Sequence, residues 1–163
     1  MVMRRLLVVL LALAVVPAAS AAFSVTLTTG NVTATGVTLN GVDQSTTFTL
    51  SITVNDASPG SGNGWNVSMA ATAPTLGAYS MPALVVTTVA SAGCTGGGCV
   101  NPTNSITWPV TLTPAGVKFY NAAVGTGTKS DILTATVKIT YAAGAPQGTY
   151  VSTLTVSGIN NGP

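Results

Sequence analysis

The stretch 46–73 constrains the fold most strongly, because it contains two runs in which apolar and polar residues alternate. Every second residue from Phe48 to Val54 is apolar, and so is every second residue from Trp65 to Ala71. A period of two is typical of a β-strand with one buried face. A polar loop rich in Gly, Ser and Asn separates the runs. The pattern predicts two strands of one β domain, with Trp65 anchoring the core.

Shorter runs of the same kind fill the rest of the chain, with turn residues between them. They are Phe23–Thr28, Asn31–Leu39, Ala83–Val89, Ser105–Thr113, Val117–Ala122, Asp131–Tyr141 and Thr149–Val156. Pro109 lacks a ladder donor, so its run is expected to be an edge strand or to carry a bulge. No amphipathic helix period follows residue 21. Eight or nine short strands predict an all-β, immunoglobulin-like β-sandwich.

The first 21 residues have the features of a secretory signal peptide. Arg4 and Arg5 precede a short apolar run, and the segment ends in Ala19-Ser20-Ala21. A basic start, an apolar centre and small residues at −3 and −1 are what a signal peptidase recognises. We therefore predict cleavage after Ala21, with residues 22–163 forming one secreted domain and no stable membrane span in the mature form. A retained anchor helix is the alternative.

Removal of this leader leaves a mature chain of balanced charge. The full chain has a formal net charge of +2, and both arginines lie in the leader. Three lysines and three aspartates remain, without Arg, Glu or His. A surface so poor in cations offers few phosphate contacts, which argues against nucleic-acid binding. It also lacks the basic patch that attracts an anionic membrane.

Two cysteines, Cys94 and Cys99, flank a run of glycines. In an exported chain such a pair favours a disulfide. A metal or redox pair is the alternative, but a metal needs more ligands and the chain has no histidine. We predict a structural disulfide between Cys94 and Cys99.

The composition argues against catalysis and against a tight metal site. General acid–base chemistry at neutral pH mostly uses His, Glu, Asp, Lys, Tyr or Cys, and the predicted mature chain has no His and no Glu. A Ser–Lys pair at Lys129–Ser130 is disfavoured, because neighbours on a strand point to opposite faces. Asp56 with Asn55 and Asn63 is the candidate for calcium, although these are also ordinary turn residues. We expect no enzyme activity, no cofactor and no metal.

Several aromatic residues are candidates for a platform that stacks on a glycan. They are Trp108, Phe119, Tyr120, Tyr79, Tyr141 and Tyr150. An uncharged protein binds carbohydrate through aromatic faces together with Asn, Thr and Ser hydrogen bonds. The alternative, that each packs in the core or at its rim, is preferred.

Two short motifs give the chain a family resemblance. Gly64-Trp65-Asn66-Val67 is similar to the Trp-x-Leu motif near the start of WxL domains, which are surface proteins of Gram-positive bacteria. The run Tyr150 to Val156 resembles their last strand, of the type Tyr-x-x-x-Leu-Thr-Trp-x-Leu. Here Val67 replaces the Leu of the first motif and Val156 replaces the Trp of the second. The resemblance carries over Trp65, Val67, Tyr150 and Leu154 as candidate wall-binding positions.

The resemblance implies an exported, non-enzymatic protein that binds the cell wall non-covalently, through peptidoglycan, beside other surface proteins. The alternative function is a structural subunit of an extracellular filament or biofilm matrix. Secreted β-sandwich subunits can polymerise by donating an N-terminal strand to the next subunit. The run Phe23–Thr28 is a candidate donor, or it pairs within its own sheet.

Overall fold

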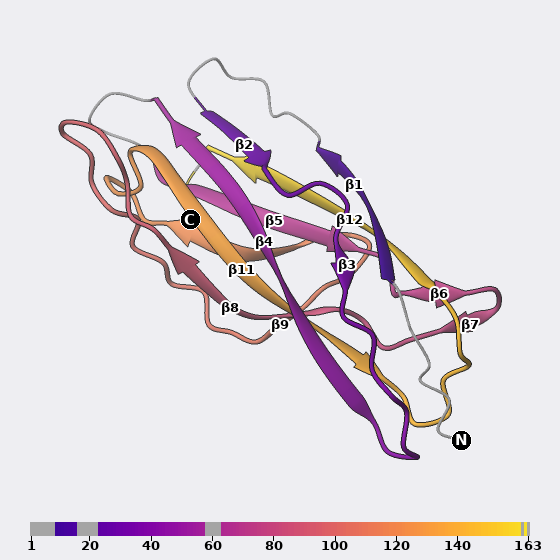
Figure 1. Ribbon diagram of the computed structural model, residues 1–163. Helices are drawn as coiled ribbons and strands as arrows, with labels where there is room; N and C mark the ends of the chain where they lie inside the picture. The colour runs from indigo at the N-terminus through magenta and orange to yellow at the C-terminus, as the bar shows by residue number, and fades with distance from the viewer. Residues whose placement is uncertain (1–8, 16–22, 58–62, 161, 163) are drawn as a thin grey trace.

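The chain folds into two β-sheets packed face to face (Figure 1). The computed structural model describes residues 9–15, 23–57, 63–160 and 162, with the backbone alone for residues 9–15. Within these residues the regular structure is entirely β. The predicted β-sandwich is therefore confirmed. The described part of the chain contains no helix with the length and hydropathy of a membrane span.

The first sheet has the strand order β10-β5-β12-β1-β3, and β6 and β7 extend it beside β12. Its strands pair antiparallel, with the exception of β1, which runs parallel to β12. The bounds are β1 Val9–Val15, β3 Thr33–Ala34, β5 Trp65–Ala71, β6 Thr75–Leu76, β7 Tyr79–Ser80, β10 Val117–Ala122 and β12 Tyr150–Ile159.

The second sheet has the order β2-β4-β11-β8-β9 and is antiparallel throughout. Two strands of 13 residues form its centre, and they pair along their whole length from Lys129–Asp56 to Tyr141–Gln44. The bounds are β2 Phe23–Leu27, β4 Gln44–Asp56, β8 Val85–Ser91, β9 Val110–Thr111 and β11 Lys129–Tyr141.

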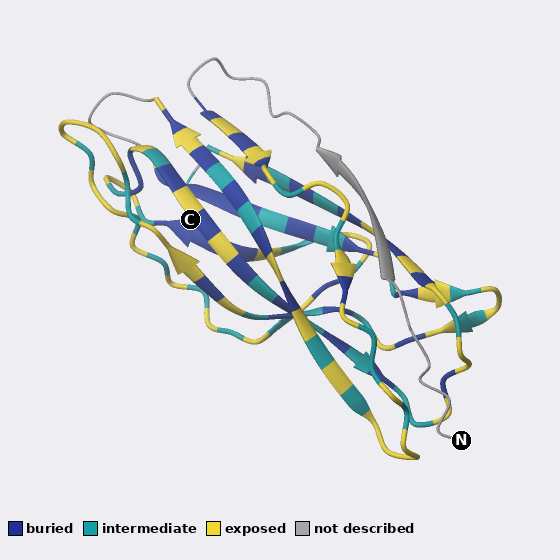
Figure 2. Cartoon of the chain, viewed as in Figure 1, coloured by how far each residue is buried: buried dark blue, intermediate teal, exposed yellow. Residues whose placement is uncertain are grey.

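The core lies between the sheets and is built from the apolar half of each alternating strand (Figure 2). In β11 the predicted face of Leu133, Ala135, Val137, Ile139 and Tyr141 is fully buried. In the burial view, buried and more exposed residues alternate along β4 and β11. Because successive strand residues point to opposite faces, β4 and β11 each contribute one face to the core and the other largely to solvent.

The two strands of the 46–73 stretch belong to different sheets. β4 lies in the five-stranded sheet and β5 in the other, so the loop between them crosses from one layer to the other (Figure 1). Residues 58–62 of this loop lie outside the described residues.

Most of the other predicted strands are present, with two that are much shorter than expected. The run 31–39 forms only the two residues of β3, and the run 105–113 only the two of β9. The Trp108–Pro109 peptide bond is cis, and the strand begins directly after it. The expectation of an edge position is confirmed, since β9 is the outermost strand of its sheet. Two short strands, β6 and β7, were not predicted.

The apolar segment of the predicted leader pairs with the sandwich. The backbone of β1 lies between β12 and β3 (Figure 1). Residues 1–8 and 16–22, including the predicted cleavage point after Ala21, lie outside the described residues. Cleavage of the leader stays a prediction.

Candidate functional site

Trp65 lies at the centre of the core, as its alternating strand predicts. Its side chain has no exposed surface. The indole N–H donates a 2.7 Å hydrogen bond to the carbonyl oxygen of Gly127, and the rings of Phe23 and Tyr120 lie at 6.4 and 6.0 Å between centroids. A buried indole needs such an acceptor for its N–H group. Trp65 thus joins the start of β5 to the turn before β11.

The other positions of the two motifs also lie in the core. Val67, Tyr150 and Leu154 have no exposed surface. The Tyr150 hydroxyl donates 2.8 Å to the carbonyl oxygen of Pro146, which ties the turn before β12 to the first residue of that strand. A similar bond, the tyrosine corner, occurs in immunoglobulin-like sandwiches. In this conformation the four motif side chains belong to the core and have no surface available for contact with a ligand.

The aromatic residues pack in the core or at its rim and do not form a platform on the surface. Phe119, Tyr120, Tyr141 and Tyr150 are buried, and Trp108 is half-buried against Tyr120 in a stacked arrangement with centroids 6.2 Å apart. Tyr79 packs edge-on against Tyr150. The large hydrophobic side chains that are exposed among the described residues are all aliphatic. Packing in the core or at its rim, the preferred interpretation, is confirmed.

Two carboxylates are buried, and neither lies in a metal-binding cluster. Asp56 ends β4 with no exposed surface, and Asp131 is 2% exposed and accepts a 2.7 Å hydrogen bond from the Ser91 hydroxyl. The pKa of the neighbouring Tyr120 is raised, mainly because its hydroxyl is buried. A hydrogen bond with Ser91 lowers this pKa, and the negative charge of Asp131 raises it. Among the described residues, no group of three or more His, Cys, Asp or Glu side chains is placed to hold a metal ion.

The predicted disulfide is present. Cys94 and Cys99 are bonded, with their Cα atoms 6.0 Å apart, and no free cysteine remains in the chain. The loop is fixed on both sides, since Thr95 pairs with Ser130 of β11 and the Asn101 side chain accepts a hydrogen bond from the Cys94 amide. A disulfide is typical of an oxidising compartment.

The solvent face of the five-stranded sheet carries ordered rows of hydroxyl groups. Thr136 pairs with Thr49 on one side and with Thr88 on the other, and Thr134 pairs with Ser51. We call this surface the threonine face; it comprises Thr26, Thr47, Thr49, Ser51, Thr53, Thr88, Thr134 and Thr136. In its register rows Lys138, opposite Thr47, is the charged residue, and Ile132, opposite Thr53, and Ala90, opposite Thr134, are exposed apolar residues.

The threonine face was not singled out in the sequence. The polar residues of the alternating runs form this surface, just as the apolar residues of the same runs form the core. The alternation does not show which strands are neighbours in the sheet. Only the pairing of β2, β4, β11 and β8 brings these side chains onto one surface. The surface offers hydrogen-bond donors and acceptors without net charge apart from Lys138.

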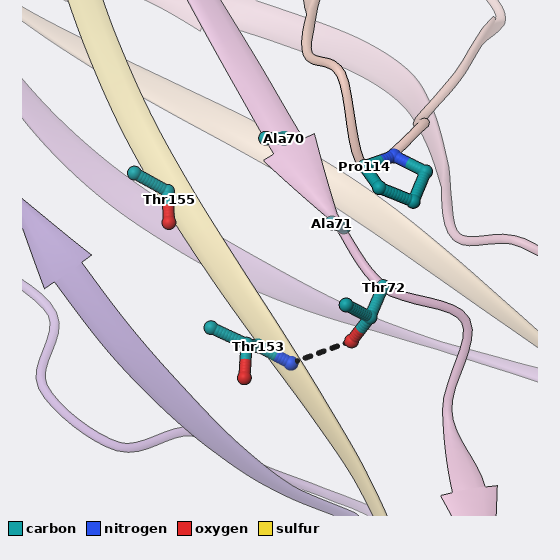
Figure 3. A pocket seen from close by; sticks show the side chains of 6 residues that line it. All are labelled: Ala70, Ala71, Thr72, Pro114, Thr153 and Thr155. Atoms are coloured by element: carbon teal, nitrogen blue, oxygen red, sulfur yellow. Dashed lines mark hydrogen bonds between the residues drawn. The ribbon is translucent and has the colours of Figure 1, made fainter.

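The other sheet has a small hollow of about 100 Å³ on its surface (Figure 3). The residues that line it are Ala70, Ala71, Thr72, Pro114, Thr153 and Thr155. The hydroxyl oxygen of Thr72 accepts a 3.0 Å hydrogen bond from the Thr153 amide, so the hollow lies where the end of β5 meets β12. Its lining contains no ionisable group. We attribute the hollow to the small side chains of Ala70 and Ala71, which leave space at the surface of the sheet.

Comparison with known proteins assigns the chain to no family. No protein-family model matches the sequence, and no curated protein matches it. The resemblance to WxL domains therefore rests on the two motifs.

Proposed function

We propose that the chain is a secreted, non-enzymatic protein of the cell surface, whose β-sandwich binds cell-wall polymer, namely peptidoglycan. The signal-peptide features, the disulfide and the WxL-like motifs support this proposal. The observation that carries it furthest is the threonine face, because it is a broad, ordered surface with little charge. Such a surface suits a polymer that is bound through many hydrogen bonds.

Because the motif residues are buried, the resemblance to WxL domains supports the fold but does not identify the binding surface. Trp65, Val67, Tyr150 and Leu154 have no exposed surface, so they specify the sandwich and place its strands. Binding would then fall to an exposed surface, the threonine face, which lies on the sheet opposite to β5 and β12. The central row of that surface, Thr49–Thr136–Thr88, spans three adjacent strands.

Replacing this row tests the proposal. The triple variant Thr49→Ala/Thr136→Ala/Thr88→Ala removes three hydroxyls and leaves the core unchanged. We expect roughly hundredfold weaker binding to purified Gram-positive cell walls in co-sedimentation, because three lost hydrogen bonds at about 1 kcal/mol each sum to about 3 kcal/mol. The matched control, Thr33→Ala/Thr75→Ala/Thr153→Ala, changes exposed threonines of the other sheet and should bind as the wild type does. Equal binding by both variants would contradict a role of the threonine face.

A second candidate function is a structural subunit of an extracellular filament or matrix, assembled by strand donation. The position of β2 favours it: this strand is the outermost of its sheet, pairs there with β4 alone, and follows the predicted cleavage point directly. Size analysis of the processed protein without cell walls distinguishes the two functions. A monomer favours the wall-binding module, and a ladder of assemblies favours the subunit.

A further inference from the structure

The backbone of β1 lies against β12 as an added parallel strand (Figure 1). Its seven residues pair one for one with β12, from Val9 opposite Tyr150 to Val15 opposite Val156. On its other side β1 pairs with the two residues of β3. β1 therefore occupies the position of one strand between β12 and β3.

The main chain of β12 requires a partner on this side. The N–H of Thr153 bonds to the hydroxyl of Thr72, and its carbonyl oxygen accepts from the Thr72 amide, so both groups point toward the end of β5. Because these directions alternate along a strand, Ser152 and Leu154 direct their N–H and C=O groups toward β1. Without β1 these groups form an open edge that can pair with another strand.

This edge lacks the features that usually prevent strand addition. β12 has ten residues and contains neither charge nor proline. By contrast, β3 and β9 are only two residues long, and β10 carries Lys118 and a shift in register next to it. Short edges, charges and irregular pairing are the common means of blocking edge-to-edge association. The sequence of β12 is that of a strand covered on both sides.

The segment that covers β12 belongs to the predicted signal peptide. Cleavage after Ala21 would remove Val9–Val15 and leave the edge open in the secreted protein. We propose that residues Tyr150–Val156 of β12 are a strand-acceptor site, covered by β1 before cleavage and by β2 of a second copy of the chain afterwards. This inference rests on the second candidate function, the subunit assembled by strand donation, and on the predicted cleavage; it does not depend on wall binding.

The sequence and position of β2 suit it as the donor. Phe23, Val25 and Leu27 are buried and alternate with exposed Ser24 and Thr26, without any charge. Among the described residues, β2 forms a ladder with β4 alone, and cleavage would make it the N-terminal strand of the chain. A free terminal strand can exchange between copies more readily than a strand with loops at both ends.

The apolar side chains of β2 already pack against β12 within one copy. A Cβ atom built on Gly158 of β12 would collide with Val25 and Phe23. In the acceptor site, a parallel register that places Phe23, Val25 and Leu27 beside Ser152, Leu154 and Val156 would direct all three toward the core. The same register places Ser24 beside Thr153 on the solvent side.

Cross-linking between two single-cysteine variants of the processed protein tests this register. Ser24→Cys and Thr153→Cys are mixed and oxidised, and because each chain carries one new cysteine, a mixed disulfide must join two copies. Both positions are exposed, and the native cysteines are already bonded. The control mixes Thr49→Cys with Thr153→Cys, since Thr49 is exposed on the far sheet. We expect roughly tenfold more mixed dimer than in the control, because pairing raises the local thiol concentration.

A form that keeps its leader tests the covering role of β1. The substitutions Ala19→Leu and Ala21→Leu remove the small residues that the peptidase requires. In the same mild detergent, this form should give mixed dimer only at the level of the control, whereas the processed form should keep its excess. Dimer at control level in the processed form would overturn the acceptor site. An equal excess in both forms would overturn the covering by β1. Neither assay contains cell wall, so a negative result here would not bear on wall binding, which the co-sedimentation experiment tests.

Discussion

The indole N–H of Trp65 and the carbonyl oxygen of Gly127 form a 2.7 Å hydrogen bond between residues 62 positions apart. The two residues are in close contact, because a Cβ atom at Gly127 would lie 2.5 Å from the indole nitrogen. Gly127 also has a φ of 68°, which favours glycine. The motif tryptophan is thus held by a residue far outside the motif.

Replacement of Trp65 should mainly reduce stability. Trp65→Ala should lower the free energy of unfolding by about 3–5 kcal/mol, because it opens a cavity in the core. Trp65→Phe keeps much of the volume but leaves the Gly127 carbonyl without its donor, at a cost of about 1–3 kcal/mol. Chemical denaturation of the purified variants measures both values. Unchanged stability with loss of wall binding alone would show that Trp65 is a surface contact.

Two buried tyrosines should respond in opposite ways to loss of the hydroxyl group. The Tyr141 hydroxyl is buried and has no hydrogen-bond partner among the described residues, whereas that of Tyr150 donates to Pro146. Tyr141→Phe should leave the unfolding free energy unchanged or raise it, and Tyr150→Phe should lower it by about 1 kcal/mol. The same denaturation experiment compares the pair. A clear loss for Tyr141→Phe would reveal a hydrogen bond at that hydroxyl.

The domain should lose stability in alkaline solution. Burial raises the pKa of Tyr120, Tyr141 and Tyr150 in the folded state. Their contribution is complete below the unfolded pKa of about 10 and is lost as the pH rises toward the folded values, because the unfolded chain releases its protons first. Unfolding measured from pH 8 to 11.5 should show this decline, and Tyr141→Phe should make it shallower. An identical slope for the variant would contradict the raised pKa of Tyr141.

Replacing Val156 by the tryptophan that the WxL motif has at this position should destabilise the domain. Val156 is 1% exposed and lies in the core opposite Met69. A larger side chain in a packed core typically costs about 1–3 kcal/mol. Val156→Trp should therefore unfold at lower denaturant and bind walls no better than wild type. Stronger binding at undiminished stability would place this position on a ligand-binding surface.

The sequence predicts the core well, because apolar and polar residues alternate wherever one face of a strand is buried. Every second residue from Phe48 to Val54 and from Leu133 to Tyr141 is buried as expected. Strand length is predicted less well where a proline, which has no backbone N–H group, interrupts an alternating run. The run 105–113 alternates, yet regular pairing is limited to Val110–Thr111, directly after Pro109, which has no N–H group to donate to a ladder.

The candidate surfaces depend on strand neighbours, which alternation does not specify. Thr49, Thr136 and Thr88 are far apart in the sequence and form a row only through the pairing of β4, β11 and β8. The pairing of β1 was missed for another reason: an apolar run in a leader predicts targeting, and its length and composition do not reveal an affinity for β12. Motif positions such as Tyr150 were found, but the motif alone does not distinguish a buried residue from a contact.

Wall binding through a surface of little charge should depend little on the salt concentration. The mature chain has three lysines and three aspartates, and two of the aspartates are buried. Exposed charge pairs are screened over roughly 10 Å at 0.1 M salt, whereas hydrogen bonds at short range are little affected.

The most direct test is co-sedimentation of the processed protein with purified Gram-positive cell walls at low and at high sodium chloride. We predict binding at both concentrations with nearly the same dissociation constant. Binding at low salt alone would contradict recognition by hydrogen bonds and would indicate a charge cluster. No binding at either concentration would contradict the wall-binding function itself.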